Sequence, residues 1–438
     1  MSSTAMISSL ISSTATRGAA INRNAAFPLA LSAGALVCSA LAWTPAASPP
    51  TAKTVRVVLP TDPPKEPEPE LASPVPVVRG EDWTTFHNSS SRQGVSRAPS
   101  IQHPAIRWKA RVGIQGWLNS PVVLGDLVLV PSSGSHHNTP DKLDGLHALD
   151  LATGKARWFA PTDLDANGVA TTKRTAFVSC DDGKLYAFGI SDGKLLSKQS
   201  GQGEMFCYPL VVGEQVIVGD AGGYLRSFNV HSGAPIWKHG LAGEIRGGAS
   251  ADDTTIYVSS TGGTVAAFDF DGKERWKRVV TRPAFTPSDT PKPIVAYPPP
   301  VITARAVIVS FARDTTYDHP AILALKKTSG RLLWQAAGRD NHHWANIRST
   351  PVFTGGNLVY AEAYSGDIVA LNSTTGKLAA RKTVGSCLFP NWASPVAASG
   401  IAYVPPHGRH SARHEGQRHE PAMVSVSWRL PGGPIGKP

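Results

Sequence analysis

The sequence predicts an all-β protein, a β-propeller of four-stranded blades. Three observations predict it. A short phrase recurs six times at a spacing of about 40 residues, two further short apolar runs precede most copies, and no helical pattern separates the runs. A small four-stranded sheet that is apolar on both faces needs a neighbour on each face, and a ring of blades supplies both.

The recurring phrase is clearest in "LHALDLATGKARW", residues 146–158. We interpret each copy as a third strand, a tight turn and a fourth strand. The turn glycines are Gly154, Gly193, Gly233, Gly272, Gly330 and Gly376, with steps of 39, 40, 39, 58 and 46 residues.

The second strands are predicted from runs such as "DLVLVPS" (126–132) and "TAFVSC" (175–180). The first strands follow prolines, as in "NSPVV" and "CYPLV", because a missing N–H costs little where a strand begins. A seventh second-strand run, "GIAYVP" (400–405), has no phrase after it. The count predicts seven blades, with eight as the alternative. We expect Trp108, in a fourth-strand segment without a third strand before it, to close the ring with C-terminal strands.

Four regions follow from these patterns. Residues 1–43 contain Arg17, Arg23 and an uncharged run over 25–43, which indicates a cleaved export signal or an uncleaved signal anchor. Residues 44–79 form a proline-rich linker, 80–405 the propeller, and 406–438 an irregular basic tail that can contribute to the closing blade. We therefore expect an exported protein, periplasmic or extracellular, with membrane attachment only through the N-terminal anchor.

The phrase has a physical basis. Asp150 and Thr153 can bond the turn backbone, Gly154 takes the tight conformation, and Trp158 falls in the fourth strand. Small third-strand residues such as Ala148 leave room for the indole between blades.

Ala148, Asp150, Thr153, Gly154, Lys155 and Trp158 together resemble the tryptophan-docking motif of the pyrroloquinoline-quinone (PQQ) type propeller repeat. In that family each Trp packs across to the next blade, which implies the same for Trp237, Trp276 and Trp334. Ser197 and Ala380 stand where Trp belongs, so those blades should dock less tightly. The resemblance covers roughly residues 83–405, since "WTTFHNSSSRQGVS" is similar to the opening segment of these proteins.

The resemblance implies two functions. Quinoprotein dehydrogenases hold PQQ and calcium in the propeller, whereas exported relatives typified by the outer-membrane barrel-assembly factor BamB bind no quinone. This sequence has no adjacent cysteine pair, and we match no calcium-ligand or catalytic-aspartate segment. We therefore expect a non-catalytic binding scaffold in the cell envelope, without catalytic residues, metal or cofactor. The alternative is a PQQ- and calcium-dependent dehydrogenase that oxidises an alcohol or a sugar.

A scaffold of this kind recognises a protein partner through its loop faces and axial funnel. The candidate partner-binding residues directly precede the inner strands: Trp117, Asn119, Tyr208, Arg246, Asn346, Arg348, Asn391 and Trp392. Their alternative role is structural, with amides and Arg satisfying inner-strand backbone. The net charge of +11 is spread along the chain and indicates no nucleic-acid partner. We expect a monomeric propeller.

Overall fold

The computed structural model describes residues 82–99, 106–114, 119–281, 295–311, 320–337, 347–361, 367–383, 394–404 and 428–429. These residues form 28 strands and no helix. The strands make seven four-stranded sheets, so the prediction of seven blades is confirmed. The expected export signal and linker (1–79) and most of the tail lie outside the described residues.

Blades 1 to 6 each use four consecutive antiparallel strands. Blade 1 contains β2 (Val122–Leu124), β3 (Leu127–Ser133), β4 (Asp144–Asp150) and β5 (Ala156–Pro161); blade 2 contains β6 (Ala166–Thr171), β7 (Thr175–Cys180), β8 (Lys184–Gly189) and β9 (Leu195–Ser200). Blade 3 contains β10 (Leu210–Val212), β11 (Gln215–Gly219), β12 (Tyr224–Asn229) and β13 (Pro235–Gly240); blade 4 contains β14 (Ala249–Ala251), β15 (Ile256–Ser259), β16 (Thr264–Phe268) and β17 (Glu274–Val279). Blade 5 contains β18 (Val301–Ile302), β19 (Ala306–Ser310), β20 (Pro320–Lys326) and β21 (Leu332–Ala337); blade 6 contains β22 (Val352–Thr354), β23 (Asn357–Ala361), β24 (Asp367–Asn372) and β25 (Leu378–Thr383).

Blade 7 closes the ring by combining one N-terminal strand with three strands from the C-terminal part of the chain. Its order is β1 (Val95–Ser96), β26 (Val396–Ala398), β27 (Ile401–Tyr403) and β28 (Trp428–Arg429). β1 runs parallel to β26, whereas β28 pairs antiparallel with β27. The expectation that Trp108 provides a strand here was wrong: residues 106–114 are described without strand, and β28 lies beside β27 instead.

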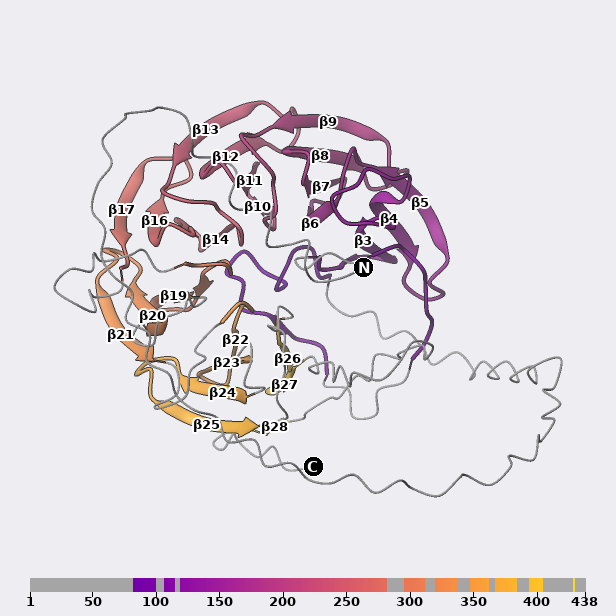
Figure 1. The fold of residues 1–438 in the computed structure, drawn as a ribbon. Coiled ribbons are helices and arrows are strands. Elements are labelled where there is room, and N and C mark those ends of the chain that lie inside the picture. The colour runs from indigo at the N-terminus through magenta and orange to yellow at the C-terminus, as the bar shows by residue number, and fades with distance from the viewer. Residues whose placement is uncertain are drawn as a thin grey trace, which may run out of the picture. The chain divides into compact units, whose positions relative to one another are not determined.

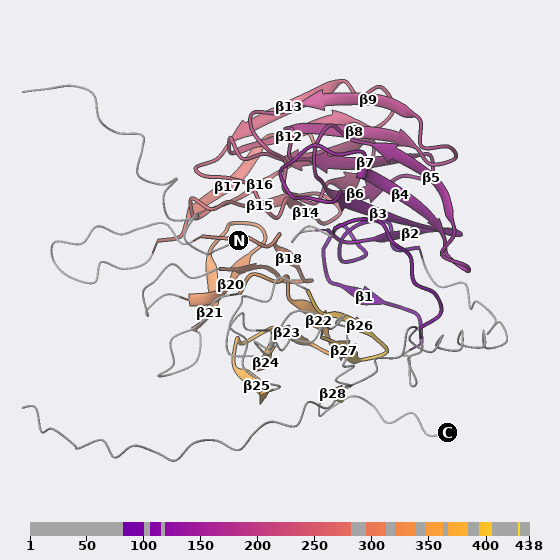
Figure 2. The same cartoon turned by 45° about the vertical axis from the view of Figure 1, so that its right-hand side comes forward.

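The blades are arranged radially, with the first strand of each sheet near the axis and the last at the rim (Figures 1 and 2). Apolar side chains fill the space between neighbouring blades, as where Leu129 and Leu146 of blade 1 pack with Val169 and Val178 of blade 2. The rim strands are largely exposed, for example β9. We call the end of the ring at which the inner strands begin the top face.

Docked tryptophans lie on the turn glycines of five blades, whereas blades 2 and 6 themselves have Ser197 and Ala380 in place of the Trp. The Trp158 indole N–H donates to the Ile190 carbonyl at 2.9 Å, and its ring lies on Gly193, whose added Cβ would be 2.5 Å from Cε3. The same arrangement joins Trp108 to Gly154, Trp237 to Gly272, Trp276 to Gly330, and Trp334 to Gly376.

The small third-strand residue Ala148 is buried between blades 1 and 2, in the cluster against which Trp158 packs. Ala148 is the cross-strand partner of Trp158 within the same sheet and directly precedes a β-bulge. Bulges follow the equivalent small residue in blades 1 to 6. The room for the indole comes from the turn glycine of the following blade, while the bulge lies beside the Trp in its own sheet.

Residues 83–96, here called the axial segment, lie at the centre of the ring (Figure 1). Its backbone carbonyls accept N–H groups from the inner strands of six blades, at Val123, Thr171, Ala251, Ile302, Phe353 and Ala397. Blade 3 is reached by side chains, since Arg92 donates to the Pro209 carbonyl at 2.9 Å and Thr85 donates to it at 3.4 Å. A single short segment therefore contacts all seven blades.

Among the described residues, Arg92 is the largest fully buried side chain. Its guanidinium donates to Thr85 Oγ1, to the Phe86 and Pro209 carbonyls and, at 3.3 Å, to the Ala249 carbonyl. The segment also holds His87, Asn88 and Arg92 itself at positive φ, of 55°, 65° and 55°. Such backbone is strained for these residues and persists only where the surroundings fix it, as these bonds do.

Candidate functional site

Four of the eight predicted partner-binding residues are described: Asn119, Tyr208, Arg246 and Arg348. The others, Trp117, Asn346, Asn391 and Trp392, lie outside the described residues. All four described residues precede inner strands at the top face, but their surroundings differ. Only the two arginines come together.

Tyr208 faces the interior of the ring. It is 6% exposed, and its ring stacks on Phe86 of the axial segment with centroids 3.7 Å apart and planes 2° apart. Burial raises the pKa of the phenol above its ordinary range, with Arg92 opposing the shift. Tyr208 thus contributes to packing around the axial segment and offers no surface to a partner.

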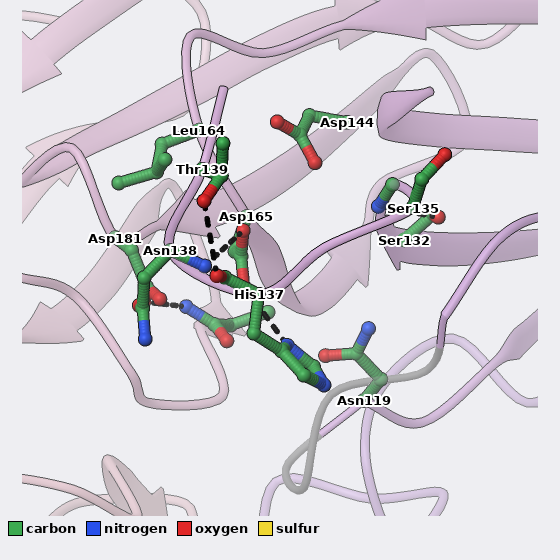
Figure 3. A network of polar contacts seen from close by, with 12 residues as sticks. Asn119, Ser132, Ser135, His137, Asn138, Thr139, Asp144, Leu164, Asp165 and Asp181 are labelled. Atoms are coloured by element: carbon green, nitrogen blue, oxygen red, sulfur yellow. Dashed lines mark hydrogen bonds and ion pairs between the residues drawn. The ribbon is translucent and has the colours of Figure 1, made fainter. Parts of the chain in front are cut away.

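Asn119 bonds to backbone of its own blade. Its Nδ2 donates to the Pro131 carbonyl at 3.1 Å, which satisfies backbone of the neighbouring strand β3. Figure 3 shows it beside His137, on the blade 1 side of the top face.

Arg246 and Arg348 belong to a group that we call the arginine–aromatic cluster: Phe206, Arg246, Tyr297 and Arg348. The guanidinium carbon of Arg246 is 4.9 Å from the Phe206 ring centroid and 5.4 Å from that of Tyr297. That of Arg348 is 5.5 Å from the Tyr297 centroid. All four side chains are half-buried. A guanidinium group over an aromatic ring is attracted to the ring face, and guanidinium groups bind carboxylates.

The cluster is assembled by the repeat. Phe206, Arg246, Tyr297 and Arg348 each precede the inner strand of their blade by three or four residues, in blades 3, 4, 5 and 6. Equivalent positions of adjacent blades meet at the top face. Glu244 forms an ion pair with Arg246 and so offsets part of its charge.

Phe206 and Tyr297 were missed in the sequence. Their signal was their position, since both precede the start of an inner strand by four residues, as Arg348 does, and Arg246 precedes its inner strand by three. In "MFCYPL" Tyr208 was the predicted site residue instead, and "AYPPPV" lies within the longest step between turn glycines, from Gly272 to Gly330.

The residues of the repeat motif lie at the rim, away from the top face. Asp150 Oδ1 accepts the Thr153 N–H and the Thr153 hydroxyl, each at 2.8 Å, and the Lys155 N–H donates to Thr153 Oγ1 at 3.3 Å. Gly154 has φ of 69°. These contacts shape the turn on which the indole of Trp108 rests.

A calcium–quinone centre does not fit the described residues. Calcium requires a set of oxygen ligands that normally includes carboxylates, and a group of three His, Cys, Asp or Glu side chains placed to hold a metal does not occur in the described ranges. Near the axis the described part of the top face presents the arginine–aromatic cluster, and the axial segment occupies the centre of the ring. Cys180 and Cys207 are buried free thiols.

Seven four-stranded blades, with tryptophans docked on five of the turn glycines, define a PQQ-like repeat β-propeller. A family model described as outer membrane protein assembly factor BamB matches residues 144–240 and 221–387, which together exceed half of the chain. The chain belongs to this family.

Known proteins resemble the chain over part of its length. The outer membrane protein assembly factor BamB of Yersinia pestis is 24% identical over 253 residues, 56% of this chain and 54% of that protein. The crystal structure of BamB from Moraxella catarrhalis is 19% identical with a TM-score of 0.49, covering 69% of this chain and 83% of that one. A quinohemoprotein alcohol dehydrogenase from Comamonas testosteroni is 15% identical with a TM-score of 0.46, covering 73% and 76%.

The chain spans about half the length of the curated relatives that it matches. Within the described ranges, a helix of the length and apolar character that a membrane crossing requires is absent.

Proposed function

We propose that the protein is an exported, non-catalytic scaffold of the cell envelope that binds a protein partner through the top face of its propeller. The arginine–aromatic cluster carries this proposal, because four successive blades place two guanidinium groups around one phenol ring there. Arg and Tyr are enriched at the energetic centres of protein interfaces. Membership of the BamB family supports a role in assembling outer membrane proteins.

The axial segment restricts how a partner can bind. Because it bonds to the inner strands around the ring, we expect recognition at the top face and not deep along the axis. Guanidinium groups beside aromatic rings favour a partner segment that carries carboxylates. The export signal or anchor at residues 1–43 and the linker at 44–79 would hold the propeller in the periplasm or outside the cell.

The test places a photo-crosslinking residue at Phe206 and, as a rim control, at Asp271 in the full-length protein. We expect a discrete envelope partner to crosslink from position 206 and not from 271. With that partner purified, Arg246→Ala combined with Arg348→Ala should weaken binding at least tenfold, as expected when paired interface charges are lost. Arg278→Ala, on the exposed face of β17, should leave affinity unchanged. Equal partner affinities of the wild type, the Arg246→Ala/Arg348→Ala double variant and Arg278→Ala would refute the proposed surface.

Titration with PQQ, with and without calcium, separates the scaffold from the dehydrogenase. Stoichiometric quinone binding together with calcium-dependent dye reduction in the presence of an alcohol would overturn the scaffold proposal. Neither signal is expected.

A further inference from the structure

The connection between β3 and β4, residues 134–143, is longer than its counterpart in blade 2, where residues 181–183 join β7 to β8. We call it the blade 1 strap. The Asp141 carboxylate shapes it by accepting the N–H groups of Ser135 and Leu143. Because it joins a second strand to a third, it lies at the top face.

The strap is bonded to the next blade at one point. His137 Nδ1 lies 3.1 Å from Asp165 Oδ2, and the Asn138 N–H donates to Asp165 Oδ1 at 3.2 Å (Figure 3). Asp165 directly precedes β6 in blade 2. A single carboxylate therefore holds the strap across the junction of the two blades.

Asp165 belongs to a group of three buried carboxyls, which we call the carboxyl cluster: Asp144, Asp165 and Asp181. Asp144 is 0% exposed, Asp165 2% and Asp181 9%. Asp181 accepts the Asn167 Nδ2–H, whereas Asp144 Oδ2 accepts the Asp141 N–H. Within the described residues, none of the three pairs with Lys or Arg.

Within the described part of the chain, the Asp144 carboxylate is buried with one oxygen unsatisfied. Its Oδ1 is buried and has no hydrogen-bond partner among the described atoms, and its carboxylate points toward the Asp165 side of the strap in Figure 3. A buried carboxylate oxygen without a donor is costly when ionised and is relieved when it takes up a proton.

Burial and the neighbouring carboxylates act in the same direction. Burial raises the pKa of Asp181 to about 6; Asp165 and Glu204 add to this, and Asn167 and His137 oppose it. Burial also raises the pKa of Asp144, to which Asp141 and Asp165 contribute, while the Asp141 N–H and His137 oppose it. The closed strap is thus disfavoured when these carboxyls are ionised, because opening it would let water reach them.

We propose that the blade 1 strap is controlled by protons: proton uptake by Asp144 and Asp181 holds it against blade 2, and proton release loosens it. The direction of the pH dependence follows from the linkage between proton binding and strap closure. A carboxyl that binds a proton more tightly in the closed state favours closure as the pH falls through its closed-state pKa. The strap should therefore be closed near pH 5 and looser above pH 7, which exposes the blade 1 side of the top face. This inference does not depend on the identity of any partner.

Hydrogen exchange of the full-length protein tests it, at pH 5.0 and 7.5 with labelling times scaled for the intrinsic rates. If opening restores an ordinary carboxyl pKa to Asp181, the protection of amides 135–138 should be up to about tenfold higher at pH 5.0. Asp181→Asn keeps the side-chain oxygen that accepts from Asn167 but cannot ionise. This variant should be protected at both pH values, with a ratio well below that of the wild type, because only Asp144 still titrates with a raised pKa.

Asp192→Asn is the matched control, since Asp192 lies in an exposed turn of the same blade, and it should keep the wild-type difference. His137→Ala removes one bond to Asp165 and should lower strap protection at both pH values, even if Asp181→Asn folds poorly. The proposal is overturned if wild-type protection does not change with pH, or if Asp181→Asn retains the full difference.

Discussion

The Trp158 indole lies across Gly193 of the next blade and donates its N–H to the Ile190 carbonyl. Gly193 meets two requirements at once. Its φ of 69° is the left-handed conformation that the turn needs, and its missing Cβ leaves the surface on which the indole rests. The stability of the ring therefore depends on glycines that sequence propensity alone would assign only to turns.

Gly193→Ala should destabilise the protein by about 2–4 kcal/mol, because the left-handed strain of about 1 kcal/mol is joined by overpacking against the indole. Gly233→Ala is the matched control. Gly233 has φ of 70°, but its Cβ would meet Ser197 Oγ at 3.0 Å, and no indole lies there. It should cost only about 1 kcal/mol. Urea unfolding measures both losses, and equal losses would show that indole docking contributes nothing.

Ser197→Trp should raise the stability by about 0.5–2 kcal/mol by supplying the missing docked residue between blades 2 and 3. The Val230 carbonyl precedes Gly233 by three residues, as Ile190 precedes Gly193, and is the expected acceptor for the new indole N–H. Ser197→Leu adds apolar surface without a donor and should gain less. Thermal melts compare the three proteins; a melting temperature of Ser197→Trp at or below wild type would contradict this prediction.

Arg92→Met should destabilise the protein by about 2–4 kcal/mol. The buried carbonyls of Phe86 and Pro209 would lose their charged donor, at a cost of about 1–3 kcal/mol each before relaxation. Arg92→Lys keeps the charge but cannot reach several acceptors at once, so it should be intermediate. Arg97→Met is the control, since Arg97 is exposed. Unfolding in urea at pH 7 gives the three values, and a loss for Arg92→Met no larger than the control's would refute the role of Arg92.

The repeat could be predicted from the sequence because its signals are local. "ALDLATGKARW" contains its own turn, glycine and tryptophan within 11 residues, so fold and blade count followed. The path of the axial segment could not be predicted, because "WTTFHNSSSRQGVS" has neither helical nor alternating periodicity. Its bonds also reach residues as distant as Ala397. For the same reason Tyr208 was expected at a recognition surface, whereas its partner Phe86 lies 122 positions earlier in the chain.

Arg246 and Arg348 could be predicted as site residues because an Arg shortly before an inner strand is conspicuous. Their common neighbour Tyr297 could not be predicted. Whether rings and guanidinium groups from blades 3 to 6 meet depends on the angle between blades, which no local pattern encodes. The carboxyl cluster was missed for a related reason: Asp144, Asp165 and Asp181 are ordinary turn and strand-end residues in sequence, and only the blade 1–blade 2 junction brings them together.

His87 should make folding weaken in mild acid. Burial lowers the pKa of its imidazole from 6.5 to about 3, with the Arg92 carbonyl, 3.1 Å from Nδ1, opposing this shift. Below pH 6.5 the unfolded chain therefore binds a proton that the folded protein does not, and the stability is lost progressively as the pH falls, by about 2 kcal/mol at pH 5. His87→Asn suits the positive φ, keeps an amide donor and cannot titrate in this range. Urea unfolding from pH 7.5 to 5 should show the wild type losing stability relative to His87→Asn, whereas parallel curves would show that the imidazole is protonated in the fold. Because proton uptake by Asp181 acts in the opposite sense, the difference between the two proteins, and not the wild-type curve alone, isolates the contribution of His87.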